Sequence, residues 1–272
     1  MNYSVEKVGK NFVVNHERLS ALECISMSVE RGEQLAVLGS SGAGKTTLFR
    51  ILNATIRPTT GSVRVDGRDL ANMSSGDLRR TRRRIGTIYQ QHNLIPSLTA
   101  LQNTLCGGLG RWSLSRTIRN IFNADKADAE DAMQSLELVG LAEKRHARAD
   151  ELSGGQQQRL AIARVLMQKP EVILADEPVA SLDPALAEEI VSLIIHVGSE
   201  GKQTLIMALH KVELAMDHFP RVIGLRAGSV SFDQPSANVH EDLLRDLYSN
   251  RFRETRQIED EDRFQREFGC IR

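Results

Sequence analysis

The stretch QLAVLGSSGAGKTTLFRILN, residues 34–53, decides the fold. Its first five residues form an apolar run between charge and glycine, which predicts a buried parallel strand over residues 34–38. Residues 45–53 predict a helix. Between the two, Gly39–Thr46 match the G-x-x-x-x-G-K-[ST] pattern of a phosphate-binding loop, in the strand–loop–helix context that such a loop requires.

The residue types of this loop explain how it would hold a phosphate. Glycines lack Cβ, so successive backbone N–H groups can turn into one concavity, and the following helix directs its positive end there. Lys45 supplies a charge for the β- and γ-phosphates, and the Thr46 hydroxyl is an oxygen ligand of the kind that Mg²⁺ prefers. The candidate phosphate-binding residues are Gly39, Ser40, Ser41, Gly42, Ala43, Gly44, Lys45, Thr46 and Thr47.

Apolar runs at residues 172–175, 204–209 and 221–225 follow helix-like segments and predict further strands. This alternation, together with the phosphate loop, predicts an α/β P-loop NTPase (RecA-like) core with a mainly parallel sheet. The first 35 residues predict a small antiparallel β piece, joined by residues 61–66.

The rest of the chain divides into two further parts. Residues 91–158 predict a helical subdomain inserted into a main domain of residues 1–240. Residues 241–272 are dense in charge and predict a helical tail, whose apolar stripe at Leu243–Tyr248 indicates packing on the domain rather than a ligand site.

The composition excludes several classes of protein. Thirty-five basic and 35 acidic residues cancel, so no overall charge favours nucleic acid, and only 4% aromatic residues disfavour a reader of single strands. Three cysteines far apart indicate a reducing compartment and form no zinc pattern. No apolar run reaches the about 18 residues of a membrane span, and the N-terminus lacks a signal peptide. We expect a soluble, cytoplasmic protein.

Two acids, Asp176 and Glu177, follow the apolar run at residues 172–175. Ligands bind beyond the carboxyl ends of parallel strands, so these acids are expected in the crevice of the phosphate loop. Asp176 would hold Mg²⁺ through water, and Glu177 would polarise the water that attacks the γ-phosphate. Solvated acids at an ordinary strand end are the alternative, which the neighbouring loop makes the weaker interpretation.

A second motif, LSGGQQQR at residues 152–159, precedes a predicted helix. Ser153 and Gln156 match a capping box, while Ser-Gly-Gly at a helix N-terminus also builds an anion site from backbone donors. One active site needs one phosphate cradle, so a second cradle indicates a nucleotide shared between two surfaces. Its candidate residues are Ser153, Gly154, Gly155 and Gln156.

The remaining signals complete an ordered set. Gln90 follows the apolar run at residues 85–89, ILADEP occupies residues 173–178, Ser181-Leu182-Asp183 comes next, and His210 ends a predicted strand. With the phosphate loop and LSGGQ, this order closely resembles the ATP-binding subunit of ABC transporters over about residues 3–235. The resemblance implies two copies packed head to tail, each ATP lying between Gly39–Thr46 of one and Ser153–Gln156 of the other.

The same resemblance implies roles for single residues. Gln90 would contact Mg²⁺ or the attacking water, so the metal candidates are Thr46, Gln90 and Asp176, and the catalytic candidates are Glu177, His210 and Gln90. His210 would reach the γ-phosphate and hold the water with Glu177. Asp183 would lie at the dimer seam, and Phe12 would stack on adenine, where many members carry Tyr. In isolation, Gln90 and His210 are ordinary strand-end residues, and Phe12 is equally a core residue.

Smaller similarities indicate the transported compound. The segments at residues 85–105, 107–111, 175–184 and 222–233 resemble the ATPase subunits of phosphonate importers. Lys211 departs from that pattern, because glutamine is frequent there, and residues 251–272 extend past the usual end. The resemblance implies ATP and Mg²⁺ as cofactors, and a peripheral position on the cytoplasmic face of the inner membrane. The implied partners are a second copy, two transmembrane permease subunits and, indirectly, a periplasmic substrate-binding protein.

Four alternatives are weighed. Another ABC system, for amino-acid import or lipoprotein release, and a non-transport ABC scaffold share the same motifs. A nucleotide kinase would leave LSGGQ and His210 without a role. The arginine cluster Arg79–Arg84 matches a nucleic-acid patch, but the zero net charge favours a solvated helix face instead.

Overall fold

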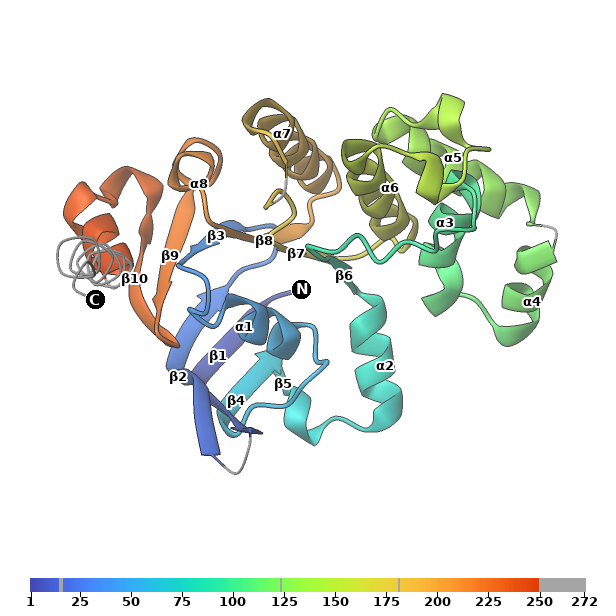
Figure 1. Cartoon of the computed structure of the whole chain (residues 1–272). Coiled ribbons are helices and arrows are strands. Elements are labelled where there is room, and N and C mark those ends of the chain that lie inside the picture. Colours follow the sequence, from blue (N-terminus) through green and yellow to red (C-terminus); the bar gives the residue numbers. More distant parts are fainter. Residues whose placement is uncertain (15–16, 123, 181, 250–272) are drawn as a thin grey trace, which may run out of the picture.

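The computed structural model describes residues 1–14, 17–122, 124–180 and 182–249 (Figure 1). A small antiparallel sheet lies near the N-terminus, as predicted, with the strand order β2-β1-β4-β5. Its strands are β1 (Tyr3–Val14), β2 (Glu17–Val29), β4 (Thr60–Val65) and β5 (Arg68–Asp69). The segment predicted to join this piece, residues 61–66, forms most of β4.

The large sheet has the order β10-β9-β3-β8-β7-β6, and its neighbours pair in parallel except β9 and β10. The strands are β3 (Gln34–Leu38), β6 (Ile85–Ile88), β7 (Val172–Asp176), β8 (Thr204–Leu209), β9 (Arg221–Arg226) and β10 (Ser229–Pro235). The mainly parallel α/β core predicted from the sequence is therefore confirmed. Parallel strands end at one edge, and this edge carries the candidate site.

Both faces of the large sheet are covered, which explains why its strands read as continuous apolar runs. Helix α1 (Lys45–Leu52) and the small sheet cover one face (Figure 1). Helices α6 (Gly154–Met167), α7 (Pro184–Glu200) and α8 (Val212–His218) cover the other. Side chains of β3 alternate between the two cores: Leu35 and Val37 join the first, and Ala36 and Leu38 join the second.

A group of helices extends from the β6 end of the large sheet, where residues 91–158 predict helices. It contains α3 (Ala100–Cys106), α4 (Leu114–Phe122), α5 (Lys126–Leu138) and three short 3₁₀ helices at Gly107–Gly110, Ala142–Lys144 and Ala149–Glu151. Another helix, α2 (Ser75–Arg83), precedes β6 and follows the 3₁₀ turn Leu70–Asn72.

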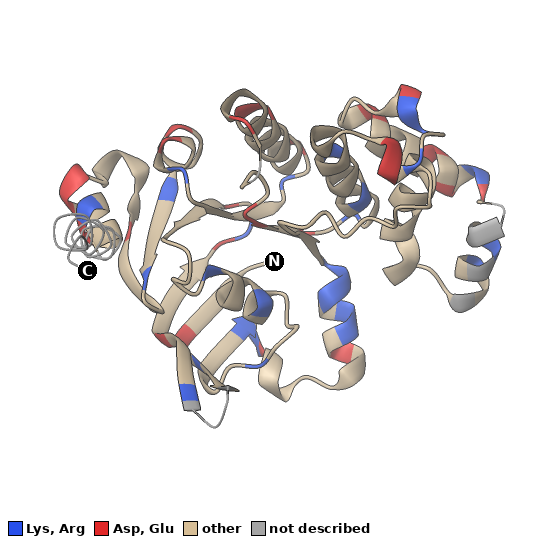
Figure 2. Cartoon of the chain, in the orientation of Figure 1, with Lys and Arg blue, Asp and Glu red and all other residues tan. Residues whose placement is uncertain are grey.

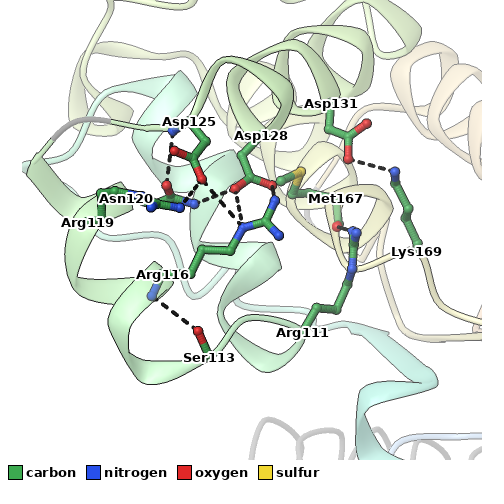
Figure 3. A network of polar contacts seen from close by, with 10 residues as sticks. All are labelled: Arg111, Ser113, Arg116, Arg119, Asn120, Asp125, Asp128, Asp131, Met167 and Lys169. Carbon is green, nitrogen blue, oxygen red and sulfur yellow. Dashed lines mark hydrogen bonds and ion pairs between the residues drawn. The ribbon is translucent and has the colours of Figure 1, made fainter.

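A polar network fastens these helices to one another (Figure 3). The guanidinium of Arg116 on α4 donates two hydrogen bonds of 2.8 Å to the carboxylate of Asp128 on α5, which is 2% exposed. Asn120 donates a third at 2.6 Å. Lys169 pairs with Asp131 at 2.6 Å. The end of α6 is therefore tied to α5, so the helix that starts in LSGGQ belongs to this group.

Residues 241–249 form a helix after the 3₁₀ turn Ser236–Asn238. Leu247 is buried, and Leu243, Leu244 and Tyr248 pack against the same core as α6–α8, which is the packing that the apolar stripe predicts. The tail predicted beyond Ser249 lies outside the described residues. Across the described ranges, no helix is both long enough and apolar enough to cross a membrane.

Candidate functional site

The phosphate loop follows β3 and opens α1, as its pattern predicts. Two of its glycines are required by space and conformation. Gly44 has a φ of +103°, and a Cβ there would lie 2.6 Å from the carbonyl oxygen of Ala21. A Cβ at Gly39 would lie 2.4 Å from the carbonyl oxygen of Leu225. Strands β2 and β9 therefore hold the loop from two sides, and only glycine permits that approach.

Lys45 is 4% exposed and points back into the loop. Its Nζ donates to the carbonyl oxygens of Gly39 at 2.7 Å and Ser40 at 3.0 Å, and lies 3.2 Å from Oε1 of Glu177. Burial lowers the pKa of Lys45, while Glu177 and Asp176 oppose that shift. The ammonium group thus links the loop to the acids that follow β7.

Asp176 is the last residue of β7 and is 7% exposed. The Thr46 hydroxyl donates to its Oδ1 at 3.4 Å, so the first turn of α1 meets the end of β7. Burial raises the pKa of Asp176, although Thr46 and Lys45 oppose the shift. A buried carboxylate beside a hydroxyl is a pair of hard oxygen donors, which suits a divalent cation.

Glu177 lies between the side chains of His210 and Lys45. Its Oε1 is 2.7 Å from Nε2 of His210 and 3.2 Å from Nζ of Lys45. The hydrogen bond from His210 and the charge of Lys45 hold the pKa of Glu177 below its usual range despite burial. Its φ of +51° is rare for a non-glycine residue and directs the carboxylate into this cluster.

The structure brings Lys45, Thr46, Asp176, Glu177 and His210 together at the carboxyl edge of the large sheet. The two acids therefore lie beside the phosphate loop, at the edge of the sheet where they were predicted. Four more predicted residues, Ser41, Gly42, Ala43 and Thr47, lie in the same loop or the first turn of α1. Their roles toward a ligand stay predictions.

The LSGGQ motif forms the predicted capping box. Ser153 Oγ accepts a hydrogen bond from Gln156 N at 3.4 Å, and Gln156 Oε1 accepts one from Ser153 N at 3.1 Å. Gly154 is exposed, and a Cβ at Gly155 would lie 2.6 Å from Cδ2 of Leu186, so the start of α6 packs on the start of α7. Asp183 caps α7, accepting from Leu186 N at 3.0 Å.

Two predicted residues stand apart from the cluster. Gln90 is exposed just after β6, at the same sheet edge, but none of its hydrogen bonds within the described residues reaches Asp176 or Glu177. Phe12 is half-buried on β1, with the ammonium of Lys10 at 5.2 Å from its ring centre. Ser181, which belongs to the predicted motif order, lies outside the described residues.

The arginine cluster is only partly a solvated helix face. Basic residues gather on α2, which is mostly blue in Figure 2. Arg79 and Arg80 are exposed, whereas Arg83 and Arg84 are half-buried. Arg84 bridges Asp66 at 2.7 Å and Glu171 at 2.6 Å. The sequence gives no signal of these two partners of Arg84, since Asp66 and Glu171 are both distant along the chain.

Sequence reasoning also missed how the loop and His210 are supported. Gly228, in the turn between β9 and β10, donates its N–H to the carbonyl of Ala43 at 3.0 Å. Tyr248, in the last described helix, donates its hydroxyl to the carbonyl of His210 at 3.4 Å. The Ala227-Gly228 turn is visible in the sequence, but nothing there shows which loop it supports.

Comparison with known proteins shows the family of this chain. A family model described as ABC transporter matches residues 22–180. A phosphonates import ATP-binding protein of Halalkalibacterium halodurans is 41% identical over 233 residues, which cover 86% of this chain and 90% of that protein. The chain belongs to the ABC transporter family. A second such ABC protein, from Pseudomonas fluorescens, is 42% identical over 239 residues, with 88% and 89% of the two chains covered.

Solved ABC structures share the fold. The ATP-binding cassette MJ0796, in a dimeric post-hydrolysis state bound to ADP and Pi, has a TM-score of 0.74 and 30% identity, with 86% of this chain and 98% of that one covered. The cassette cbiO1 of Clostridium perfringens has a TM-score of 0.74 and 26% identity, with 94% and 98% covered. The ABC family match includes the phosphate loop, LSGGQ and both acids, while His210 lies beyond it.

Proposed function

We propose that this ABC chain is the ATP-hydrolysing subunit of an importer for phosphonate or a related phosphorus compound. The observation that carries the proposal is the cluster at one sheet edge, where Lys45, Glu177 and His210 meet beside the phosphate loop. A cation for the phosphates and a carboxylate for the attacking water are the groups that phosphoryl transfer to water requires.

Different residues of this chain bind the phosphates, orient the attacking water and accept its proton. The loop N–H groups and Lys45 bind and orient the β- and γ-phosphates, because they present donors and one mobile charge. Glu177 stays ionised beside His210 and Lys45, so its carboxylate orients the water and accepts its proton. His210 fixes the carboxylate at 2.7 Å, and its imidazole would reach the γ-phosphate of a bound nucleotide.

Mg²⁺ fits the oxygen donors that the structure assembles. Thr46 and Asp176, whose side-chain oxygens lie 3.4 Å apart, would hold it, with Gln90 as a further candidate from the sequence. Bound there, the ion would neutralise charge on the phosphate oxygens.

The nucleotide is shared between two copies. Ser153–Gln156 present an exposed helix N-terminus that suits an anion, and the side-chain hydrogen bonds given for these four described residues lie within the motif, not with the phosphate loop of the same chain. The solved relative MJ0796 is dimeric. We therefore assign the γ-phosphate of each ATP to the phosphate loop of one copy and to the LSGGQ motif of the other. Phe12 is the proposed support for adenine, and Asp183 lies near the seam.

A groove beside β6 is the proposed docking surface for the membrane subunits. Its volume is about 500 Å³, and its lining includes Arg79, Arg82, Arg83 and Arg164 but no carboxylate. Exposed Tyr89, next to Gln90, lies on the same wall. A partner segment that carries acidic groups would complement this charge, and the two membrane subunits would hold the chain at the cytoplasmic face of the membrane.

The cargo rests on similarity, since this subunit does not touch the transported compound. Relatives at 41% and 42% identity are named phosphonates import ATP-binding proteins, and these names favour phosphonate over amino-acid or lipoprotein systems. Lys211, where the phosphonate group often has glutamine, does not alter the catalytic residues.

The test has two arms. The purified chain, assembled with its membrane subunits, should hydrolyse ATP when Mg²⁺ is present, and a deletion strain should lose growth on a phosphonate as sole phosphorus source while growing normally on phosphate. If the complex hydrolyses ATP but the deletion strain grows normally on the phosphonate, the chain belongs to another ABC system. Absence of hydrolysis by the assembled complex would refute the ATPase proposal itself.

A further inference from the structure

The helix at residues 241–249 reaches two turns of the candidate site. Figure 1 places it, in red, at the β10 end of the large sheet, opposite the helical group of α3–α5. Leu247 is 1% exposed and anchors the helix in the core that it shares with α8. The polar residues on either side of this anchor then contact the ends of β8 and β9.

One polar contact reaches the end of β9. Asp246 pairs with Arg226, the last residue of β9, at 2.6 Å. The turn that follows donates the Gly228 N–H to Ala43 in the phosphate loop at 3.0 Å. The helix is therefore connected to the phosphate loop through Arg226 and the turn between β9 and β10.

The other contact reaches His210 directly. Tyr248 is half-buried against the core, and its hydroxyl donates to the carbonyl oxygen of His210 at 3.4 Å. His210 is the residue after β8, and its Nε2 lies 2.7 Å from Glu177 across the ends of β7 and β8. The orientation of an imidazole depends on its own backbone, and a hydrogen bond to the carbonyl restricts the rotation of that peptide.

We propose that Tyr248 is a positioning residue for ATP hydrolysis, acting through the main chain of His210 to fix the Glu177–His210 pair. The inference rests on the proposed function, because it needs the catalytic role of that pair. It gives the helix at residues 241–249 a task in the reaction, beyond covering one end of the sheet.

The variant Tyr248→Phe tests this with the full chain assembled with its membrane subunits. It removes the hydroxyl and keeps the ring that packs on the core. We expect kcat for ATP to fall about 3- to 10-fold with KM unchanged, since one neutral hydrogen bond outside the phosphate contacts is lost. Ser249→Ala is the matched control, because the Ser249 hydroxyl donates only to Asp246, within its own helix, among its described contacts.

The split between kcat and KM separates positioning from general support of the fold. A loosened Glu177–His210 pair slows the hydrolytic step, whereas Lys45 and the phosphate loop still bind the nucleotide, so KM for ATP keeps its wild-type value. Tyr248→Phe should therefore lower kcat alone, and Ser249→Ala should change neither kcat nor KM.

Each result decides between the two claims. An unchanged kcat in Tyr248→Phe would overturn the positioning role, while wild-type hydrolysis keeps the proposed function intact. Equal effects of Tyr248→Phe and Ser249→Ala would also overturn it, in favour of a packing role of the helix. Failure of the proposed function would appear separately, because the Glu177→Gln variant would then hydrolyse ATP at the wild-type rate.

Discussion

The two regions that we propose to bind the phosphates of ATP differ in how their polar groups are satisfied. At the phosphate loop, Glu177 contacts both Lys45 and His210, so three separate parts of the chain meet, and Lys45 and Glu177 are largely buried. At LSGGQ, the side chains of Ser153 and Gln156 accept hydrogen bonds from each other's backbone N–H groups, at an exposed helix start. The first region is assembled by one chain, whereas the second presents the backbone N–H groups of a helix start, which have no acceptor within their own helix. This difference is what a site shared by two copies predicts.

The sharpest test of the closed region is Glu177→Gln. Hydrolysis should fall about 10²–10⁴-fold, because the amide cannot accept the proton of the attacking water. ATP binding should persist and trap a pair of copies, detectable by light scattering. Glu171→Gln, at the opposite end of β7, is the control and should retain turnover. Full activity of Glu177→Gln would remove the carboxylate from the mechanism.

Lys45→Ala is expected to weaken nucleotide binding. Losing a charge-assisted contact to phosphate should lower the affinity about 10- to 100-fold, measured by calorimetry. Lys144, an exposed lysine of the helical group, provides the control variant Lys144→Ala, with unchanged affinity. Equal affinities of Lys45→Ala and wild type would exclude Lys45 from the site.

The helical group that presents LSGGQ depends on Asp128. Burial raises the pKa of Asp128, but hydrogen bonds from Arg116 and Asn120 outweigh burial and lower it overall. Its stabilisation is present above the unfolded pKa and is lost as pH falls through the lower folded pKa. Asp128→Asn should therefore cost about 1–2 kcal/mol of unfolding free energy at pH 7, and the cost should start to shrink below about pH 4 and vanish only below the lower folded pKa.

Denaturant titrations across pH measure this difference. Asp150→Asn alters a more exposed pair with Arg148 and should stay within about 0.5 kcal/mol of wild type. A cost of Asp128→Asn that persists undiminished at low pH would contradict the ionic account of the network.

Ser153→Ala should have the smallest effect on stability and a selective effect on assembly. Loss of the cap costs about 1 kcal/mol. Binding of ATP by the single chain should stay unchanged, whereas ATP-driven pairing in a Glu177→Gln background should weaken. Thr99→Ala removes the equivalent capping box of α3 and is the control for helix stability alone. If both variants pair equally well, LSGGQ does not hold the shared nucleotide.

The sequence predicted those parts of the site that obey local rules. The pattern from Gln34 to Thr46 specifies strand, loop and helix in order, and parallel strands bring Asp176 to the same edge. Contacts between residues that are distant along the chain could not be predicted from the sequence. The bridge from Arg84 to Glu171, and the contact of Tyr248 with His210, depend on tertiary packing that no spacing reveals.

Strand β3 has a mechanical consequence for the loop that it carries. Its side chains are divided between two separate cores, so the strand is clamped from above and below. A cavity in either core would cost free energy, yet the intact core would still hold the backbone in register. Variants that shorten a side chain in one core should therefore decrease in cellular abundance, while the molecules that stay folded keep their affinity for nucleotide.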